Sequence, residues 1–307
     1  MGNFLLLGIC LFIGIALQKI KAFPNDAYKT LNGFIIYVSL PALALLYIPF
    51  IEFNKDAFIA ISMLWVFFVV IFFLLEGIGK VMKWDRSTLM CLLLTCGLSN
   101  TAFVGFPLIE TFYGEEGLVV GMIVHYLGSL LVLSTVGVAA ATFAGGEKVK
   151  WKNLGLDLLK FPPFSFFLLA MILGQVGRPD WFPLVYVDVS KEVLGKLGAT
   201  MTPLALISVG LQLRLQLDMK LFQTMSIGLS LKLLIGPLLM WLAYVQIIGI
   251  DTPMIEIAIF DCAMPPMVTG AIIAGLYGHR PQLASLMVGV GTIIGMGTVY
   301  GWYLFLS

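Results

Sequence analysis

Two membrane-length apolar stretches of this chain are interrupted at matching places by polar residues, glycine and proline. Proline breaks a helix, and glycine permits close approach of the backbone. A helix broken within lipid is tolerated only where protein or a cavity covers its unpaired N–H and C=O groups. A pair of such interruptions indicates a site for a transported solute near the middle of the bilayer. The residues expected to contact a solute there are Asn100, Thr101, Gly105 and Pro107 in the first interruption, and Met264, Pro265 and Pro266 in the second.

The second interruption begins with an acidic residue, Asp261, in an otherwise apolar segment. A carboxylate in the middle of the membrane costs several kcal/mol unless it is paired, protonated or solvated. We therefore expect Asp261 to carry a proton or to bind a coupling cation, with Na⁺ placed near Asp261 and Thr101. The alternative is a purely structural salt bridge. Lys232, inside another apolar segment, is expected either to neutralise Asp261 or attract an anion, or to extend its amine to the membrane interface.

Further polar and proline residues lie within apolar segments. Glu110 follows the first interruption by one turn and is a second candidate acid, and Asn100 is a candidate ligand of the coupling ion. His125 is expected to relay protons or, alternatively, to be a hydrogen-bonded packing residue. Pro41 and Pro203 kink two segments at equivalent places, where they either line a groove facing the interruptions or only shape the packing. The alternative for Asn100 is a bridge between helices.

Composition places the chain in a membrane. Of its 307 residues, 60% are hydrophobic and 11% are charged, whereas soluble domains carry about 25% charged residues. The four cysteines lie in apolar runs without metal-ligand spacing. The sequence has no basic, aromatic-interleaved patch for nucleic acid, no phosphate loop and no catalytic motif. We therefore expect neither an enzyme nor a cofactor, apart from a coupling H⁺ or Na⁺.

Hydropathy predicts about ten spans of roughly 20 residues each. Most Lys and Arg residues fall in loops on one side, which the positive-inside rule assigns to the cytoplasm, so both termini are expected outside the plasma (inner) membrane. The predicted spans are 2–18, 28–50, 57–79, 87–112, 116–143, 162–177, 192–213, 220–249, 253–277 and 281–306.

The two halves of the chain are faintly similar. Gly33 and Pro41 match Gly195 and Pro203 at a constant offset, which indicates an internal repeat. Because each copy holds an odd number of spans, about five, the second copy must be inverted. We predict a first five-helix repeat over 1–145, a cytoplasmic connecting loop over 146–160 and a second five-helix repeat over 161–307.

Several segments resemble the recurrent blocks of the auxin efflux carrier family. The segment 97–108 is similar to the family's fourth-span signature, and 40–43, 202–210 and 263–266 are similar to other blocks. The resemblance implies an all-α fold of ten helices in an inverted 5+5 repeat, related to bile-acid sodium symporters, with broken helices 4 and 9 crossing. It further implies a scaffold of helices 1, 2, 6 and 7, which often forms a homodimer, and a transport domain of helices 3–5 and 8–10 that moves as an elevator.

The usual substrates implied by the resemblance are small organic anions, namely auxin in plants and malate- or malonate-type acids in bacteria. The second interruption carries Met264 and two prolines where the family has a second asparagine, which argues against plant-like auxin recognition. The short central polar stretch favours a prokaryotic-type member. The sequence thus predicts a secondary transporter of a mono- or dicarboxylate, with a non-transporting membrane sensor and a channel as alternatives.

Overall fold

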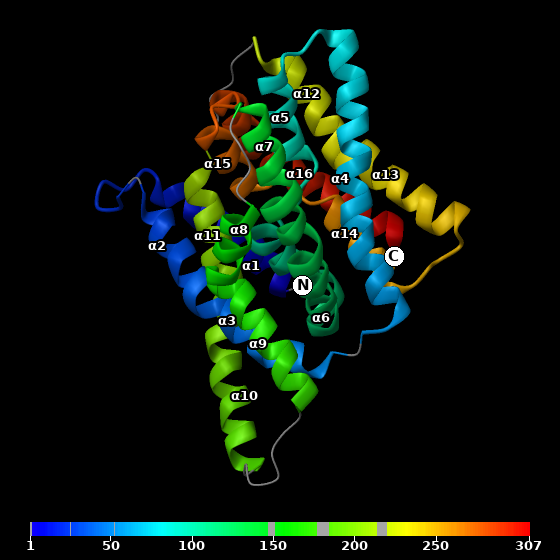
Figure 1. The fold of residues 1–307 in the computed structure, drawn as a ribbon. Coiled ribbons are helices and arrows are strands. Elements are labelled where there is room, and N and C mark those ends of the chain that lie inside the picture. The colour runs from blue at the N-terminus through cyan, green and yellow to red at the C-terminus, as the bar shows by residue number, and fades with distance from the viewer. Residues whose placement is uncertain (1, 25, 52, 147–150, 177–183, 214–219) are drawn as a thin grey trace. The chain divides into compact units, whose positions relative to one another are not determined.

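A computed structural model describes residues 2–24, 26–51, 53–146, 151–176, 184–213 and 220–307. Helices make up 86% of the structure, and the described residues contain no β-strand (Figure 1). The predicted all-helical class is therefore confirmed. Contacts divide the chain into two compact units: unit 1 is Met1–Phe53, Phe106–Met122 and Gly155–Gln212, and unit 2 is Asn54–Gly105, Ile123–Leu154 and Leu213–Ser307.

In the described part of the chain, six helices are long and apolar enough to cross a membrane, or seven if two helices bent by 74° form one span. The sequence predicted about ten spans. The count is lower because the two interruptions leave pieces shorter than a span, and because Thr101–Ala144 is counted as one helix. Gly114, with a φ of 70°, kinks that helix where the sequence predicts a boundary between spans. The ten-helix inverted repeat stays a prediction.

Unit 1 is built on close contacts between helices. A Cβ atom on Gly14 would lie 2.8 Å from the Cα atom of Gly210, the kind of approach that small residues permit between membrane helices. Ser39 and Thr200 join two other helices through a 2.8 Å hydrogen bond. The elements of this unit are α1 (Gly2–Leu17), α2 (Ala27–Phe34), η1 (Ile35–Ser39), α3 (Leu40–Tyr47), η2 (Ile48–Phe50), most of α6 (Phe106–Ile123), α9 (Pro162–Val176), α10 (Leu184–Ala199) and α11 (Met201–Gln212).

Unit 2 contains the second interruption and the first interruption as far as Gly105. Helix α4 packs against α14 and η4, and α5 packs against α4, α15 and α16. The elements of this unit are α4 (Lys55–Met82), α5 (Arg86–Cys96), η3 (Thr101–Gly105), η4 (Val124–Leu130), η5 (Leu133–Gly137), α7 (Val138–Ala144), α12 (Phe222–Ser230), η6 (Leu231–Ile235), α13 (Gly236–Trp241), η7 (Leu242–Ile247), α14 (Pro253–Cys262), α15 (Val268–Leu276) and α16 (Pro281–Leu306).

The predicted connecting loop is partly helical. Residues 147–150 of this loop lie outside the described residues, and its last ten residues form helix α8 (Trp151–Lys160). This helix contains both charged and apolar residues, and Trp151 is 62% exposed. Its polar composition predicts a loop, whereas the structure has a helix, because an amphipathic helix can be polar on one face and apolar on the other. That residues 146–160 form the cytoplasmic connection between two repeats stays a prediction.

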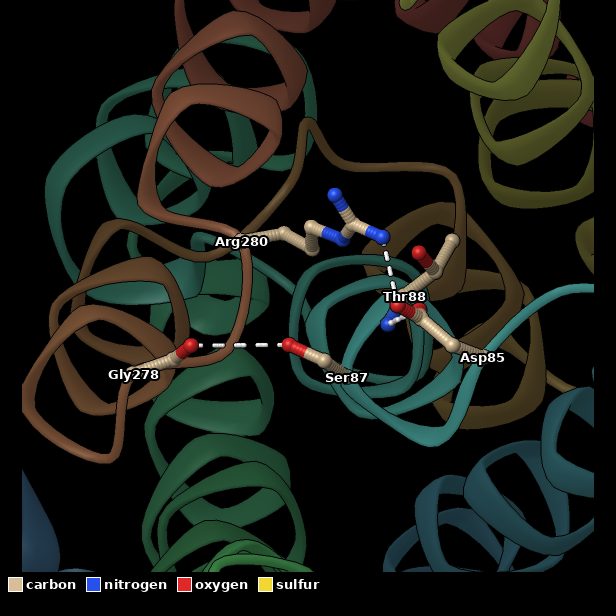
Figure 2. A network of polar contacts seen from close by, with 5 residues as sticks. All are labelled: Asp85, Ser87, Thr88, Gly278 and Arg280. Carbon is tan, nitrogen blue, oxygen red and sulfur yellow. Dashed lines mark hydrogen bonds and ion pairs between the residues drawn. The ribbon is translucent and has the colours of Figure 1, made fainter.

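A polar network joins the start of α5 to the loop between α15 and α16 (Figure 2). Asp85 caps α5 by accepting a hydrogen bond of 2.8 Å from the backbone N–H of Thr88, and it forms an ion pair with Arg280. Ser87 donates to the carbonyl of Gly278. Burial alone would raise the pKa of Asp85, but the hydrogen bonds from Thr88 and the charge of Arg280 leave this pKa below its usual value.

Because the folded-state pKa of Asp85 is lowered, its contribution to stability is present above the unfolded pKa of about 4 and is lost as the pH falls through the folded pKa. We expect Asp85→Ala to lower the melting temperature at pH 7 by about 2 °C, from loss of a cap worth about 1 kcal/mol. Asp85→Asn, which still caps, should lower it less. Thermal unfolding from pH 7 to pH 3.5 checks this; a gap between wild type and Asp85→Asn that widens in acid would contradict the prediction.

Candidate functional site

The two interruptions lie side by side in unit 2. Helix α5 ends at Cys96 and helix α14 ends at Cys262, and a short non-helical segment follows each end. Ser99 and Pro266 form an antiparallel β-bridge, and the N–H of Asn100 donates to the carbonyl of Pro265 at 3.0 Å. The backbone groups freed by one interruption are therefore paired with those of the other, as a break in a membrane helix requires. Both interruptions predicted from the sequence are present.

Each interruption starts a second half-helix. The π-helix η3 begins at Thr101 and α15 begins at Val268. Helices α5 and α15 run antiparallel, since their inner ends meet at the β-bridge and their outer ends at the network of Figure 2. A Cβ atom on Gly270 would lie 2.1 Å from the carbonyl oxygen of Leu94, so the two backbones are in close contact. Helices α5 and α15 are thus held together at both ends, by the β-bridge at one end and by the polar network at the other.

The prolines of the second interruption rest on two glycines of α16. A Cβ atom on Gly291 would lie 2.8 Å from the ring of Pro266, and one on Gly295 would lie 2.7 Å from the ring of Pro265. Any larger residue at either position would overlap a proline ring, so only glycine fits there. Sequence reasoning missed both glycines as site residues, although their spacing of four is the signal of close helix packing in membranes.

Unpartnered polar atoms converge at the paired interruptions. Asn100 is 2% exposed, and Thr101 and Asp261 are fully buried. Among the described residues, Nδ2 of Asn100 donates no hydrogen bond, and neither carboxyl oxygen of Asp261 accepts one with standard geometry. The hydroxyl of Thr101 is a nearby hydrogen-bond donor to this carboxyl group, and the amine of Lys232 attracts it through its charge. Buried polar atoms without partners are costly, so these atoms mark a place suited to a solute, an ion or a proton.

Lys232 lies in η6 and is fully buried. Its Nζ donates to Oγ of Ser99 at 2.8 Å and to the carbonyl of Cys262 at 3.0 Å. It also lies 4.6 Å from the ring centroid of Phe67. The predicted alternative in which Lys232 extends to the interface is therefore wrong. Sequence reasoning missed Ser99 and Phe67, although Ser99 directly precedes Asn100.

Lys232 and Asp261 interact through their charges but do not form the direct ion pair that the sequence predicts. Within the described part of the chain, ion pairs closer than 4.0 Å join Lys29 to Asp26, Lys196 to Glu192 and Arg280 to Asp85. Lys232 and Asp261 interact through their charges without such direct contact. The carboxyl group therefore keeps its oxygens available for another partner.

The remaining predicted residues lie elsewhere. His125 is buried in η4, with its ring 5.3 Å from that of Tyr126, and η4 packs against η3. Glu110 belongs to unit 1, where it accepts a 2.8 Å hydrogen bond from Thr202. Three further predicted residues also belong to unit 1: Pro41 in α3, Pro107 in α6 and Pro203 in α11. Their roles stay predictions.

Comparison with known proteins decides the family. The sequence profile of the membrane transport protein family, which is auxin efflux carrier-like, matches residues 4–303. The chain belongs to the membrane transport protein family. Members named among its relatives are transporters, so this family member is an integral membrane transporter and not an enzyme. The predicted family is confirmed.

Relatives of this family member come from archaea and bacteria. An uncharacterised transporter of Methanothermobacter thermautotrophicus is 24% identical over 96% of this chain and 94% of its own length. An uncharacterised transporter of Methanocaldococcus jannaschii is 28% identical over 67% of this chain and 66% of its own length. A Rhizobium meliloti protein, named as a candidate malonate transporter, is 24% identical over 95% of this chain and 91% of its own length.

Proposed function

We propose that this protein is a secondary active transporter of a small organic anion, a mono- or dicarboxylate of the auxin or malate type, coupled to H⁺ or Na⁺. The observation that carries the proposal is the contact between the two interruptions. Among the described residues there, Nδ2 of Asn100 donates no hydrogen bond and the oxygens of Asp261 accept none of standard geometry. The name of the R. meliloti relative supports a carboxylate substrate.

In this proposal, the substrate carboxylate binds at the starts of the second half-helices. Helix starts present unpaired N–H groups and partial positive charge, which favour an anion. The amide of Asn100 donates a further hydrogen bond, and Asp261 carries the coupling ion. The buried position of both side chains keeps competing water from the bound solute.

Elevator movement is part of the proposal. Unit 1 holds α1–α3 and α9–α11, and unit 2 holds α4, α5, α7 and α12–α16. This division supports a scaffold and a separate transport domain, although residues Phe106–Met122 group with unit 1. A homodimer formed through the scaffold, both termini outside and a plasma-membrane location complete the proposal.

Counterflow tests the transport function. Proteoliposomes preloaded with unlabelled malonate should accumulate labelled malonate transiently, because a carrier exchanges solutes across the membrane. Preloading is expected to leave the uptake rate through a channel unaccelerated, and a sensor is expected to move no label. If malonate gives no exchange, the same assay is run with acids selected by thermal shift at two pH values, with and without Na⁺. Absence of counterflow with every acid that binds would overturn the proposal.

Asn100→Ala removes the amide proposed to hold the substrate. We expect the substrate concentration for half-maximal flux to rise about tenfold or more, since one hydrogen bond to a charged group contributes roughly 1.5–3 kcal/mol. Initial-rate uptake at varied substrate concentration measures this. Asn153→Ala, an exposed position in α8, is the matched control and should behave as wild type. Unchanged flux kinetics in Asn100→Ala would count against the role of this residue.

A further inference from the structure

The amine of Lys232 lies where the first half-helices end. The carbonyl of Cys262, the last residue of α14, accepts its hydrogen bond, and Ser99 follows shortly after the end of α5. The C-terminal end of a helix carries partial negative charge and unpaired carbonyls. In transporters with interrupted helices, such ends and the neighbouring unwound carbonyls are where coupling cations bind.

The groups around the amine are those that would surround a small cation. They comprise a carbonyl at 3.0 Å, a hydroxyl at 2.8 Å and an aromatic face at 4.6 Å, with the carboxyl group of Asp261 acting through its charge. The side chain is fully buried, so it does not contact bulk solvent. The π-helical turn η6 carries Lys232, and such turns are frequent at functional positions.

We propose that Lys232 is a tethered cation: its amine permanently occupies a cation position at the paired interruptions that would otherwise bind Na⁺. The proposal rests on the proposed transport function and deepens it, because it decides between the two coupling ions. With this position filled covalently, transport does not require Na⁺. Asp261, whose oxygens are not engaged by a direct ion pair among the described residues, is left to bind H⁺.

Removal of the lysine side chain tests the proposal. Lys232→Ala leaves the hydroxyl of Ser99 and the carbonyl of Cys262 beside an empty space, with the charge of the Asp261 carboxylate acting on it. These oxygens are ligands suited to Na⁺. We expect the variant to gain a saturable stabilisation by Na⁺ that the wild type lacks. At a Na⁺ concentration ten times the dissociation constant, the melting temperature should rise by about 3 °C.

The measurement is thermal unfolding of the purified protein in NaCl against N-methyl-D-glucamine chloride at equal ionic strength, together with binding of ²²Na⁺. Lys80→Ala, which removes an exposed lysine of α4, is the matched control and should show no Na⁺ response. Adding Asp261→Asn to Lys232→Ala should abolish the response, because it removes the charged ligand. None of these measurements uses an organic acid, so a failure of the transport function would leave them interpretable.

Two results would overturn the proposal. One is saturable binding of Na⁺ to the wild-type protein with dependence of stability on Na⁺, since the position would then be open despite the lysine. The other is a folded Lys232→Ala or Lys232→Ser protein, monodisperse and helical by circular dichroism, that does not respond to Na⁺. The wild-type measurement stands on its own if neither variant folds: no saturable Na⁺ effect supports the proposal, and such an effect overturns it.

Discussion

Asp261→Asn is expected to lower gradient-driven transport at least tenfold while the protein stays folded. Asparagine has nearly the same shape as aspartate but cannot take up and release a proton. Within the described residues neither carboxyl oxygen accepts a hydrogen bond of standard geometry, so folding gains little from this carboxylate. A tenfold loss of rate corresponds to about 1.4 kcal/mol in the activation barrier.

Two assays separate the parts of this prediction. Uptake driven by a pH gradient should fall in Asp261→Asn, whereas exchange of labelled for unlabelled substrate is retained if the variant is only uncoupled. Asp251→Asn, an exposed position shortly before α14, should transport like wild type. Full gradient-driven uptake by Asp261→Asn would remove Asp261 from the coupling step.

Gly291→Ala is expected to reduce transport about tenfold or more by displacing the second interruption. The added methyl group would meet the ring of Pro266 at 2.8 Å and Leu229 at 2.7 Å. A proline ring cannot rotate away from the added methyl group, so the backbone of the interruption must shift. Overpacking of this kind costs about 1–3 kcal/mol, and displacement of the site by even about 1 Å reduces a rate strongly.

The same helix supplies the control for this variant. A Cβ atom on Gly297 of α16 would meet nothing within 4 Å, so Gly297→Ala should transport normally and be slightly more stable, because alanine favours a helix. Rates are normalised to folded protein, and the half-saturating concentration is measured as well. A displaced site raises that concentration, whereas simple loss of stability changes only the amount of active protein. Normal kinetics in Gly291→Ala would contradict the positioning role of Gly291.

The positions of the interruptions could be predicted from the sequence, but most of their partners could not. Proline and glycine within apolar runs indicate where a helix must break. An acidic residue such as Asp261 in such a run must lie inside the protein and not in lipid. The β-bridge between Ser99 and Pro266 joins residues far apart in the chain, and hydropathy has no signal for such a contact. For the same reason the contacts of Lys232 with Ser99, Cys262 and Phe67 appear only in the structure.

Local composition also misled in places. Helix α8 is polar enough to resemble a loop, yet its apolar residues recur at helical spacing. Gly114 lies between two predicted spans, and the structure has helix on each side of it with one residue of non-helical backbone. Such details depend on one or two dihedral angles, which an average over 20 residues cannot resolve.

The backbone pairing between the interruptions has a consequence for how the paired interruptions can evolve. Pulling Ser99 away from Pro266 would expose N–H and C=O groups to lipid, at several kcal/mol for each group. The two segments must therefore change together: an insertion, deletion or shift of register in one is viable only with a compensating change in the other. Selectivity for new solutes is consequently expected to arise by exchange of side chains on a fixed frame.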